Sequence, residues 1–248
     1  VITCSSNVSN ATMTWVQAST NASGAANGAG NAVNGLFTIS QTLTSTSNVP
    51  GNVVYTVTPS AQGCVGTQQQ VGVTVNPIPV ASVNPGAQTI CSGTTTGILF
   101  SGNMPGISFG WTVSNNNNII GAFAGSNDSI VQLLTNTSTG IQQVTYNVTP
   151  SLNGCVGAGV NVIVTVNPTP VLTTNVANAT ICSGTSTNIV LSSNVLNTTY
   201  TYTASPMVGV VGAGSGIANP IVQQLTNNTL NPLQVTYDIT PRANTCDG

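Results

Sequence analysis

Six cysteines are the residues whose type and spacing most clearly suggest chemistry in this chain. Three of them, Cys64, Cys155 and Cys246, recur at intervals of 91 residues. Two more, Cys91 and Cys182, are also 91 residues apart, and each precedes a member of the first series by 64 residues. Cysteines at such fixed spacing are typical of a disulfide framework, which forms in an oxidising compartment. The spacing therefore predicts an exported protein with one disulfide in each repeat.

We expect each disulfide to close within one repeat. Cys91 would then bond Cys155, and Cys182 would bond Cys246, so that the first loop of a repeat is linked to its last hairpin. A crosslink that closes a ring of this size stabilises a small domain by about 4 kcal/mol in the loop-closure model. For a module with a thin hydrophobic core, this would be a large part of the free energy of folding.

The first repeat departs from the cysteine pattern. When Trp15 is aligned with Trp111, Cys4 falls opposite Phe100, inside a strand, and not opposite the other cysteines that precede Ser-Gly. The sequence leaves open whether Cys4 bonds Cys64. Either the chain begins one strand late and the usual partner lies upstream, or Cys4 replaces that partner through a local rearrangement.

Charged side chains are almost absent from the 248 residues, which contain Arg242, Asp128, Asp238 and Asp247 but no Lys, Glu or His. General acid–base catalysis requires a group with a pKa near the working pH, and a serine or threonine nucleophile requires a neighbouring base. Metal sites require clustered Cys, His or carboxylate ligands. The composition predicts a protein that is not an enzyme, with no catalytic, cofactor-binding or metal-binding residues.

The same composition restricts the partners that the chain can have. Phosphate binding needs a stripe of Lys and Arg, so we expect no nucleic acid partner. Apolar runs stay short of the roughly 18 residues that a membrane helix needs, so we expect no membrane insertion. A net charge of only -2 favours self-association. Neighbouring copies of the same protein are therefore the first expected partner, and surface glycans are the second.

A longer motif shows that the chain is an array of similar modules. Val144-Thr-Tyr-Asn-Val-Thr-Pro150 has counterparts at 53–59 and 235–241, again 91 residues apart. The joints carry Val-Asn-Pro-x-Pro at 75–79 and 166–170, and such prolines favour a short, stiff and extended connector. The expected modules are residues 1–77, which lack an N-terminal strand; 78–168, which are complete; and 169–248, which lack a C-terminal strand. We expect the chain to be a window from a longer periodic protein.

Alternation of apolar and polar residues predicts antiparallel strands throughout. In the second repeat, Val144, Tyr146 and Val148 share one face, and the valines of 160–166 repeat the alternation after an Asn-Gly turn. About seven short strands in roughly 90 residues are typical of an Ig-like β-sandwich, so the expected fold is all-β. Further strands are predicted at 97–100, 108–113 and 130–134. Bulky aromatic residues are predicted in the cores, namely Trp15, Trp111, Tyr202, Tyr55, Tyr146 and Tyr237.

Motifs along nearly the whole chain resemble the PKD-like Ig modules of very large secreted proteins of Bacteroidota. The resemblance implies tandem modules in a linear array on an extracellular or cell-surface protein, often a giant adhesin exported by the type IX secretion system, in which they form a stalk or filament. The motifs are Ile90-Cys-Ser-Gly93, Phe109-Gly-Trp-Thr112, Val131-Gln-Leu-Leu-Thr-Asn136, Val144-Thr-Tyr-Asn-Val-Thr-Pro150, Asn153-Gly-Cys155 and Val164-Thr-Val-Asn-Pro-Thr-Pro170.

The expected function is that of a structural and adhesive surface protein, and two alternatives stay open. The modules could bind glycans or act as spacers in a secreted multidomain enzyme, which predicts exposed aromatic residues such as Tyr200. They could also form a fibre by strand exchange between subunits.

Separately, Asp128-Ser129-Ile130 resembles the O-glycosylation tripeptide of Bacteroidota, with Ser129 as the acceptor; the alternative is an ordinary turn that enters a strand.

Overall fold

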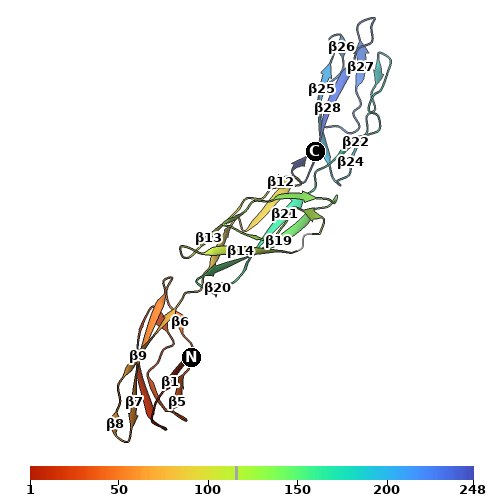
Figure 1. The fold of residues 1–248 in the computed structure, drawn as a ribbon. Coiled ribbons are helices and arrows are strands. Elements are labelled where there is room, and N and C mark those ends of the chain that lie inside the picture. The colour runs from red at the N-terminus through yellow and green to blue at the C-terminus, as the bar shows by residue number, and fades with distance from the viewer. Residues whose placement is uncertain (115–116) are drawn as a thin grey trace.

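The computed structural model describes residues 1–114 and 117–248, and every regular element in these residues is a β-strand. The strands form three modules that follow one another end to end in an extended array (Figure 1). Strands β1 to β9 belong to module 1, β10 to β21 to module 2 and β22 to β29 to module 3. The all-β architecture and the linear array of antiparallel sandwich modules are confirmed.

Module 2 has the largest set of paired strands. Its main sheet has the order β11-β21-β19-β14-β16, with β20 paired to β19, and two smaller sheets have the orders β10-β13-β17 and β12-β18-β15. The strands are β10 (Ala81–Asn84), β11 (Ala87–Cys91), β12 (Thr94–Thr95), β13 (Ile98–Gly102), β14 (Ser108–Ser114), β15 (Ile119–Ile120), β16 (Gly125–Ser126), β17 (Ser129–Ile130), β18 (Leu133–Asn136), β19 (Gln142–Leu152), β20 (Cys155–Val156) and β21 (Val160–Asn167).

The valine alternation determines the register of the central hairpin. Antiparallel pairing of β19 with β21 sets Val144 opposite Val164, and Tyr146 opposite Val162. All four side chains are fully buried, and they pack with Trp111 and with apolar residues of the smaller sheets. Because side chains alternate between the two faces of a strand, the threonines and asparagines between them face outward. The predicted hairpin is confirmed.

Module 1 has the same plan with fewer paired strands. Its main sheet has the order β4-β2-β7-β8, with β9 paired to β7, and small sheets join β1 to β5 and β3 to β6. The strands are β1 (Ile2–Ser5), β2 (Thr12–Thr20), β3 (Ala22–Ser23), β4 (Gly28–Asn31), β5 (Leu36–Ile39), β6 (Thr44–Ser45), β7 (Gly51–Ala61), β8 (Cys64–Val65) and β9 (Gln69–Val75).

Module 3 has a narrower main sheet, with the order β25-β28-β29. Small sheets β22-β24 and β23-β27-β26 complete it. The strands are β22 (Leu172–Thr174), β23 (Thr185–Ser186), β24 (Leu191–Ser193), β25 (Thr199–Pro206), β26 (Val210–Val211), β27 (Gln224–Asn227), β28 (Val235–Ala243) and β29 (Cys246–Asp247).

The strand predicted at 130–134 is not continuous, and this prediction is corrected. Residues Ser129–Ile130 pair with β13, whereas Leu133–Asn136 pair with β12 and β15 in a different sheet. The chain changes sheet at Gln132, whose side chain turns inward. Its Oε1 accepts hydrogen bonds from the Tyr146 hydroxyl at 2.8 Å and from the Phe123 N–H at 3.1 Å. An inward-facing polar side chain with these partners interrupts the strand.

The same glutamine contact recurs in every module. Tyr55, Tyr146 and Tyr237 each donate a hydroxyl hydrogen bond of 2.8 Å to a glutamine 14 residues earlier in the chain. Tyr55 and Tyr146 are buried, and Tyr237 packs against its module's core. The predicted core role of the three tyrosines is therefore confirmed. Burial raises the pKa of Tyr146 to about 12.

The other predicted aromatic core residues are also found in the cores. Trp111 and Tyr202 are buried, and Trp15 packs against Phe37 with ring centroids 5.4 Å apart. Tyr200, considered above as an exposed sugar contact, is only 8% exposed and lies in the core of module 3. Its ring is therefore not available on the surface for stacking on a glycan.

Candidate functional site at the module joints

Both joints use the same polar contact. At the first joint, Asn76 Nδ2 donates to the Asn153 carbonyl at 3.3 Å; at the second, Asn167 Nδ2 donates to the Asn244 carbonyl at 2.7 Å. Each pair links the last residues of one module to the hairpin tip of the next. Because donors and acceptors are both displaced by 91 residues, the joint is a repeated structure.

The hairpin tip has the backbone shape that this contact requires. Asn153 and Gly154 both have positive φ, at 49° and 80°, as do Asn244 and Thr245, at 49° and 69°. Two consecutive positive φ values are typical of a tight I′ turn, and asparagine and glycine adopt them at low cost. The turn directs the asparagine carbonyl toward the preceding module, where the donor lies.

A glycine just after each hairpin cysteine allows close contact with the linker. A Cβ atom added at Gly157 would lie 1.9 Å from the Pro79 carbonyl oxygen, and one added at Gly248 would lie 1.8 Å from that of Pro170. No real side chain tolerates such distances, so the backbones touch here. The linker prolines are therefore packed against the following module and do not form a loose tether.

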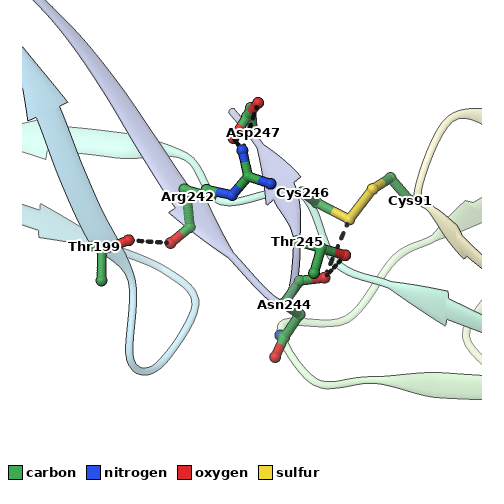
Figure 2. Close-up of polar contacts among 7 residues, drawn as sticks. All are labelled: Cys91, Thr199, Arg242, Asn244, Thr245, Cys246 and Asp247. Atoms are coloured by element: carbon green, nitrogen blue, oxygen red, sulfur yellow. Dashed lines mark hydrogen bonds and ion pairs between the residues drawn. A yellow bond between two sulfur atoms is a disulfide. The ribbon is translucent and has the colours of Figure 1, made fainter.

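A disulfide crosses the second joint. Cys91 of module 2 is bonded to Cys246 of module 3, with Cα atoms 5.7 Å apart and a sequence separation of 155 residues. Figure 2 shows the bond beside Asn244 at the hairpin tip. Cys246 is 1% exposed and Cys91 is half-buried, so the bond lies largely out of contact with solvent, between the modules. Module 2 and module 3 are thus joined twice, by the linker and by the disulfide.

This bond corrects the two within-module disulfides predicted above. Strand β11 runs parallel to β21 and sets Cys91 beside Asn167, at the C-terminal end of β21. Cys155 lies before β21, at the opposite end of the module. The eight residues of β21 span about 26 Å at about 3.3 Å each. A disulfide needs Cα atoms roughly 4.4–6.8 Å apart, so Cys91 and Cys155 are too distant.

The predicted bond between Cys182 and Cys246 is likewise replaced, because Cys246 is already bonded to Cys91. Four cysteines have no disulfide partner among the described residues: Cys4, Cys64, Cys155 and Cys182. Cys4 pairs with Phe37 within the β1–β5 sheet and packs against the core, so the strand position predicted for it is confirmed. Burial raises the pKa of its thiol, which lowers the fraction of reactive thiolate.

The few charged groups of this region lie on the surface. Arg242 donates to the Asp247 carboxylate at 3.0 Å, and both side chains are more than half exposed. A single exposed ion pair of this kind contributes at most about 1 kcal/mol to stability. The joint is therefore held by the disulfide, the asparagine contact and backbone packing.

Other chemical sites considered from the sequence have no further support. Ser129 is half-buried in β17 opposite Leu99, and its glycosylation remains a prediction. Among the described residues, no three His, Cys, Asp or Glu side chains come together as metal ligands would. In the same part of the chain, no helix has the length and apolar character needed to cross a membrane.

The fold and the joints define a class of protein, a tandem array of Ig-like sandwich modules. Comparison with protein families makes this specific, because the PKD-like domain model matches residues 2–79, 88–170 and 179–248. The chain belongs to the PKD-like domain family. No curated protein matches its sequence.

Among solved structures, the crystal structure of the chicken CNTN1 FN1–FN3 domains aligns with 98% of this chain and 87% of that chain. The two are 9% identical in sequence, and the TM-score is 0.26. This score is too low to support an argument about function.

Proposed function

We propose that this chain is a tension-bearing segment of an extracellular stalk or filament, a non-enzymatic structural or adhesive part of a large surface protein. The observation that carries the proposal is the disulfide across the second joint. Ordinary tandem modules are connected only by their linker, so a pull on the chain can unfold each in turn. A bond between modules changes the path along which force travels.

The disulfide removes most of two modules from this path. Force that enters at Cys91 passes through the disulfide to Cys246, so residues 92–245 lie inside a closed loop. These residues contain nearly all the strands of modules 2 and 3 after β11. Pulling on the ends of the chain therefore cannot extend them unless the disulfide is reduced. In the loop-closure model, a ring of this size also adds about 5 kcal/mol to stability.

The composition of the chain supports an extracellular location. Disulfides persist in oxidising compartments and are rare in the cytosol. The surface relies on Thr, Asn, Ser and Gln, with only four charged side chains, so neighbouring rods could lie side by side without electrostatic repulsion. A giant adhesin of Bacteroidota, exported by the type IX system, is the setting that we propose for such a segment.

Single-molecule force spectroscopy tests this proposal. The 248-residue chain would be pulled from its two ends, with and without reductant. We expect the oxidised chain to release the contour length of module 1 and β10, on the order of 300 Å. Reduction should add the residues inside the loop, on the order of 500 Å.

The control variant is Cys91→Ser, which should show the longer extension without reductant, whereas Cys64→Ser should behave as the parent chain. Full extension of the oxidised parent chain would contradict the proposal. Equal extension of the parent chain and Cys91→Ser would contradict it as well, since the disulfide would then not carry the force.

A second candidate is a fibre subunit that exchanges strands with its neighbours. The observation that favours it is an open sheet edge: among the described residues, β9 pairs only with β7. Open edges readily accept a further strand. Concentration-dependent fibres from the purified chain that resist reduction would support strand exchange, whereas monomers at high concentration would exclude it. The glycan-binding alternative loses its expected contact, because Tyr200 is buried.

A further inference from the structure

The turn that carries Cys182 is built like the turn that carries the bonded Cys91. The two cysteines occupy the same position in successive repeats. Thr185 Oγ1 donates to the Cys182 carbonyl at 2.6 Å, and Thr94 Oγ1 donates to the Cys91 carbonyl at 2.7 Å. In both modules the glycine after Cys-Ser donates a backbone hydrogen bond of 2.8 Å to a leucine carbonyl. Cys182 therefore has the local structure of a bonded cysteine, yet it is exposed and unbonded.

The segment before Cys182 lacks the neighbour that its counterpart has. In module 2, β11 forms a parallel pair with β21. The equivalent residues 178–182 are exposed and form no strand. Within the described residues, β28 pairs only with β25 and β29, whereas its counterpart β19 also pairs with β21. Module 3 thus presents a vacant strand position between β28 and residues 178–182.

Burial of the inward-facing residues reflects the same vacancy. Val144, Tyr146 and Val148 of β19 are fully buried, but the equivalent residues of β28 are only half-buried. A side-chain amide is also affected. Asn136 Nδ2 donates to the Val166 carbonyl of β21 at 2.9 Å and to a loop carbonyl at 2.7 Å, whereas Asn227 Nδ2 retains only the loop contact, at 2.8 Å. The missing strand would supply the second acceptor.

We propose that Cys182 is a crosslinking site for the hairpin cysteine of a further module of the same kind, joined to module 3 in the same polypeptide. The occupant of the vacant position is a strand like β21, followed by a Pro-x-Pro linker. Two thiols are oxidised to the disulfide, and a disulfide-containing oxidant takes up their two electrons and two protons and leaves as two thiols. The same polypeptide is the source because the observed bond joins modules adjacent in one chain.

Bonds of this kind overlap along the array. Cys182 lies in sequence between Cys91 and Cys246, so a bond from Cys182 to the next hairpin would begin inside the loop of the observed bond. Each module would then be crossed by two covalent paths. This inference rests on the stalk function proposed above and extends it to the next joint. The Cys182 bond is tested by the mass of crosslinked peptides, whereas the stalk function is tested by force spectroscopy. Either one can therefore fail without the other.

The periodicity of the chain allows a direct test. Gly157 and Gly248 occupy the same position of the repeat, so residues 158–248 can be appended after Gly248 without disturbing the 91-residue register. The extended chain would be oxidised, its free thiols alkylated and its peptides mapped without reduction. We expect Cys182 bonded to the hairpin cysteine of the appended unit, together with the original Cys91–Cys246 bond as an internal measure of correct folding.

Three altered chains make the test decisive. Changing Cys182→Ser in the extended chain should leave the appended hairpin cysteine open to alkylation, whereas Cys4→Ser should leave the new bond intact. Appending only residues 158–170 supplies the strand without the cysteine. It should protect the backbone amides of β28 and of residues 178–182 from hydrogen exchange, while Cys182 stays a free thiol.

Three outcomes would overturn the proposal. In the first, Cys182 remains a free thiol in an extended chain that has formed the Cys91–Cys246 bond. In the second, Cys182 crosslinks two copies, which would make a second molecule the partner. In the third, the added strand leaves β28 unprotected, which would mean that module 3 has no vacant strand position.

Discussion

In each module the repeated glutamine links a core tyrosine to the backbone of a loop. Gln132 Oε1 accepts from the Tyr146 hydroxyl and the Phe123 N–H, and its Nε2 donates to the Phe123 carbonyl at 2.8 Å. The Trp111 indole N–H donates to the same carbonyl at 2.9 Å. One side chain thus accepts the hydrogen bond of a buried tyrosine hydroxyl and also holds the loop at Phe123 in place. Buried polar groups rarely remain without such partners.

Replacing this glutamine should destabilise the module. Gln132→Leu removes three hydrogen bonds and leaves the buried Tyr146 hydroxyl without an acceptor, so we expect a loss of about 2–4 kcal/mol. Gln143→Leu is the matched control. Among the described residues, the exposed Gln143 side chain makes one hydrogen bond, to the Thr165 hydroxyl, so the loss of stability in this variant should stay below about 0.5 kcal/mol. Amide hydrogen exchange of β14 and β19 measures the loss of stability in both variants. Equal protection in the two variants would show that the contact is not stabilising.

Tyrosine ionisation should link stability to alkaline pH. The pKa of Tyr146 is about 12 in the folded chain, against 10.0 for a free tyrosine, and burial also raises the pKa of Tyr55. Between these values the unfolded chain binds fewer protons than the folded chain, so stability falls as pH rises from 10 to 12. The denaturation midpoint and tyrosinate absorbance would be followed together, with free thiols alkylated. A midpoint that is constant across this range would contradict the expectation.

At the scale of elements, the joint works because two backbones touch. The hairpin turn projects its asparagine carbonyl, the preceding strand supplies an asparagine amide, and a glycine admits the linker proline. These parts recur at both joints, although the disulfide is present only at the second in the described chain. At the first joint, the effect of the non-covalent contacts on stability can therefore be measured without a disulfide.

A single methyl group should loosen the first joint. Gly157→Ala would set a Cβ 1.9 Å from the Pro79 carbonyl oxygen, so the hairpin and the linker must separate. Gly97→Ala is the control, since a Cβ there meets nothing within 4 Å. Faster amide exchange at Ile78, at Val80 and at residues 153–157 is expected in the first variant only. If both variants exchange like the parent chain, the joint does not depend on this contact.

At the scale of the whole molecule, the sequence predicts the modules well but not their connection. Alternating valines determine the hairpin register, and the 91-residue period shows which cysteines are equivalent. The period does not determine the disulfide pairing. Separations of 64 and 155 residues differ by one 91-residue repeat, so both join equivalent cysteines. Strand direction decides between them: β11 runs parallel to β21, so Cys91 is carried to the end of the module that faces module 3.

Other features of the structure have no local signal in the sequence. Gln41, Gln132 and Gln223 recur at 91-residue intervals, and this recurrence was the only sign of their role in the sequence. The break at Gln132 cannot be predicted from the sequence, because residues 130–134 are apolar enough to form one strand. Burial of Tyr200 depends on the sheet that packs over it. These outcomes depend on contacts between segments far apart in the chain.

A covalent link across the second joint is the feature on which the proposed stalk function depends. The most direct test is peptide mapping of the native chain without reduction, after free thiols have been blocked at acidic pH to prevent disulfide exchange. We expect a crosslinked peptide that contains Cys91 and Cys246, with Cys155 and Cys182 blocked as thiols. Recovery of Cys91 bonded to Cys155, and of Cys182 bonded to Cys246, would contradict it, because each module would then be closed on itself and the joint would depend on its linker.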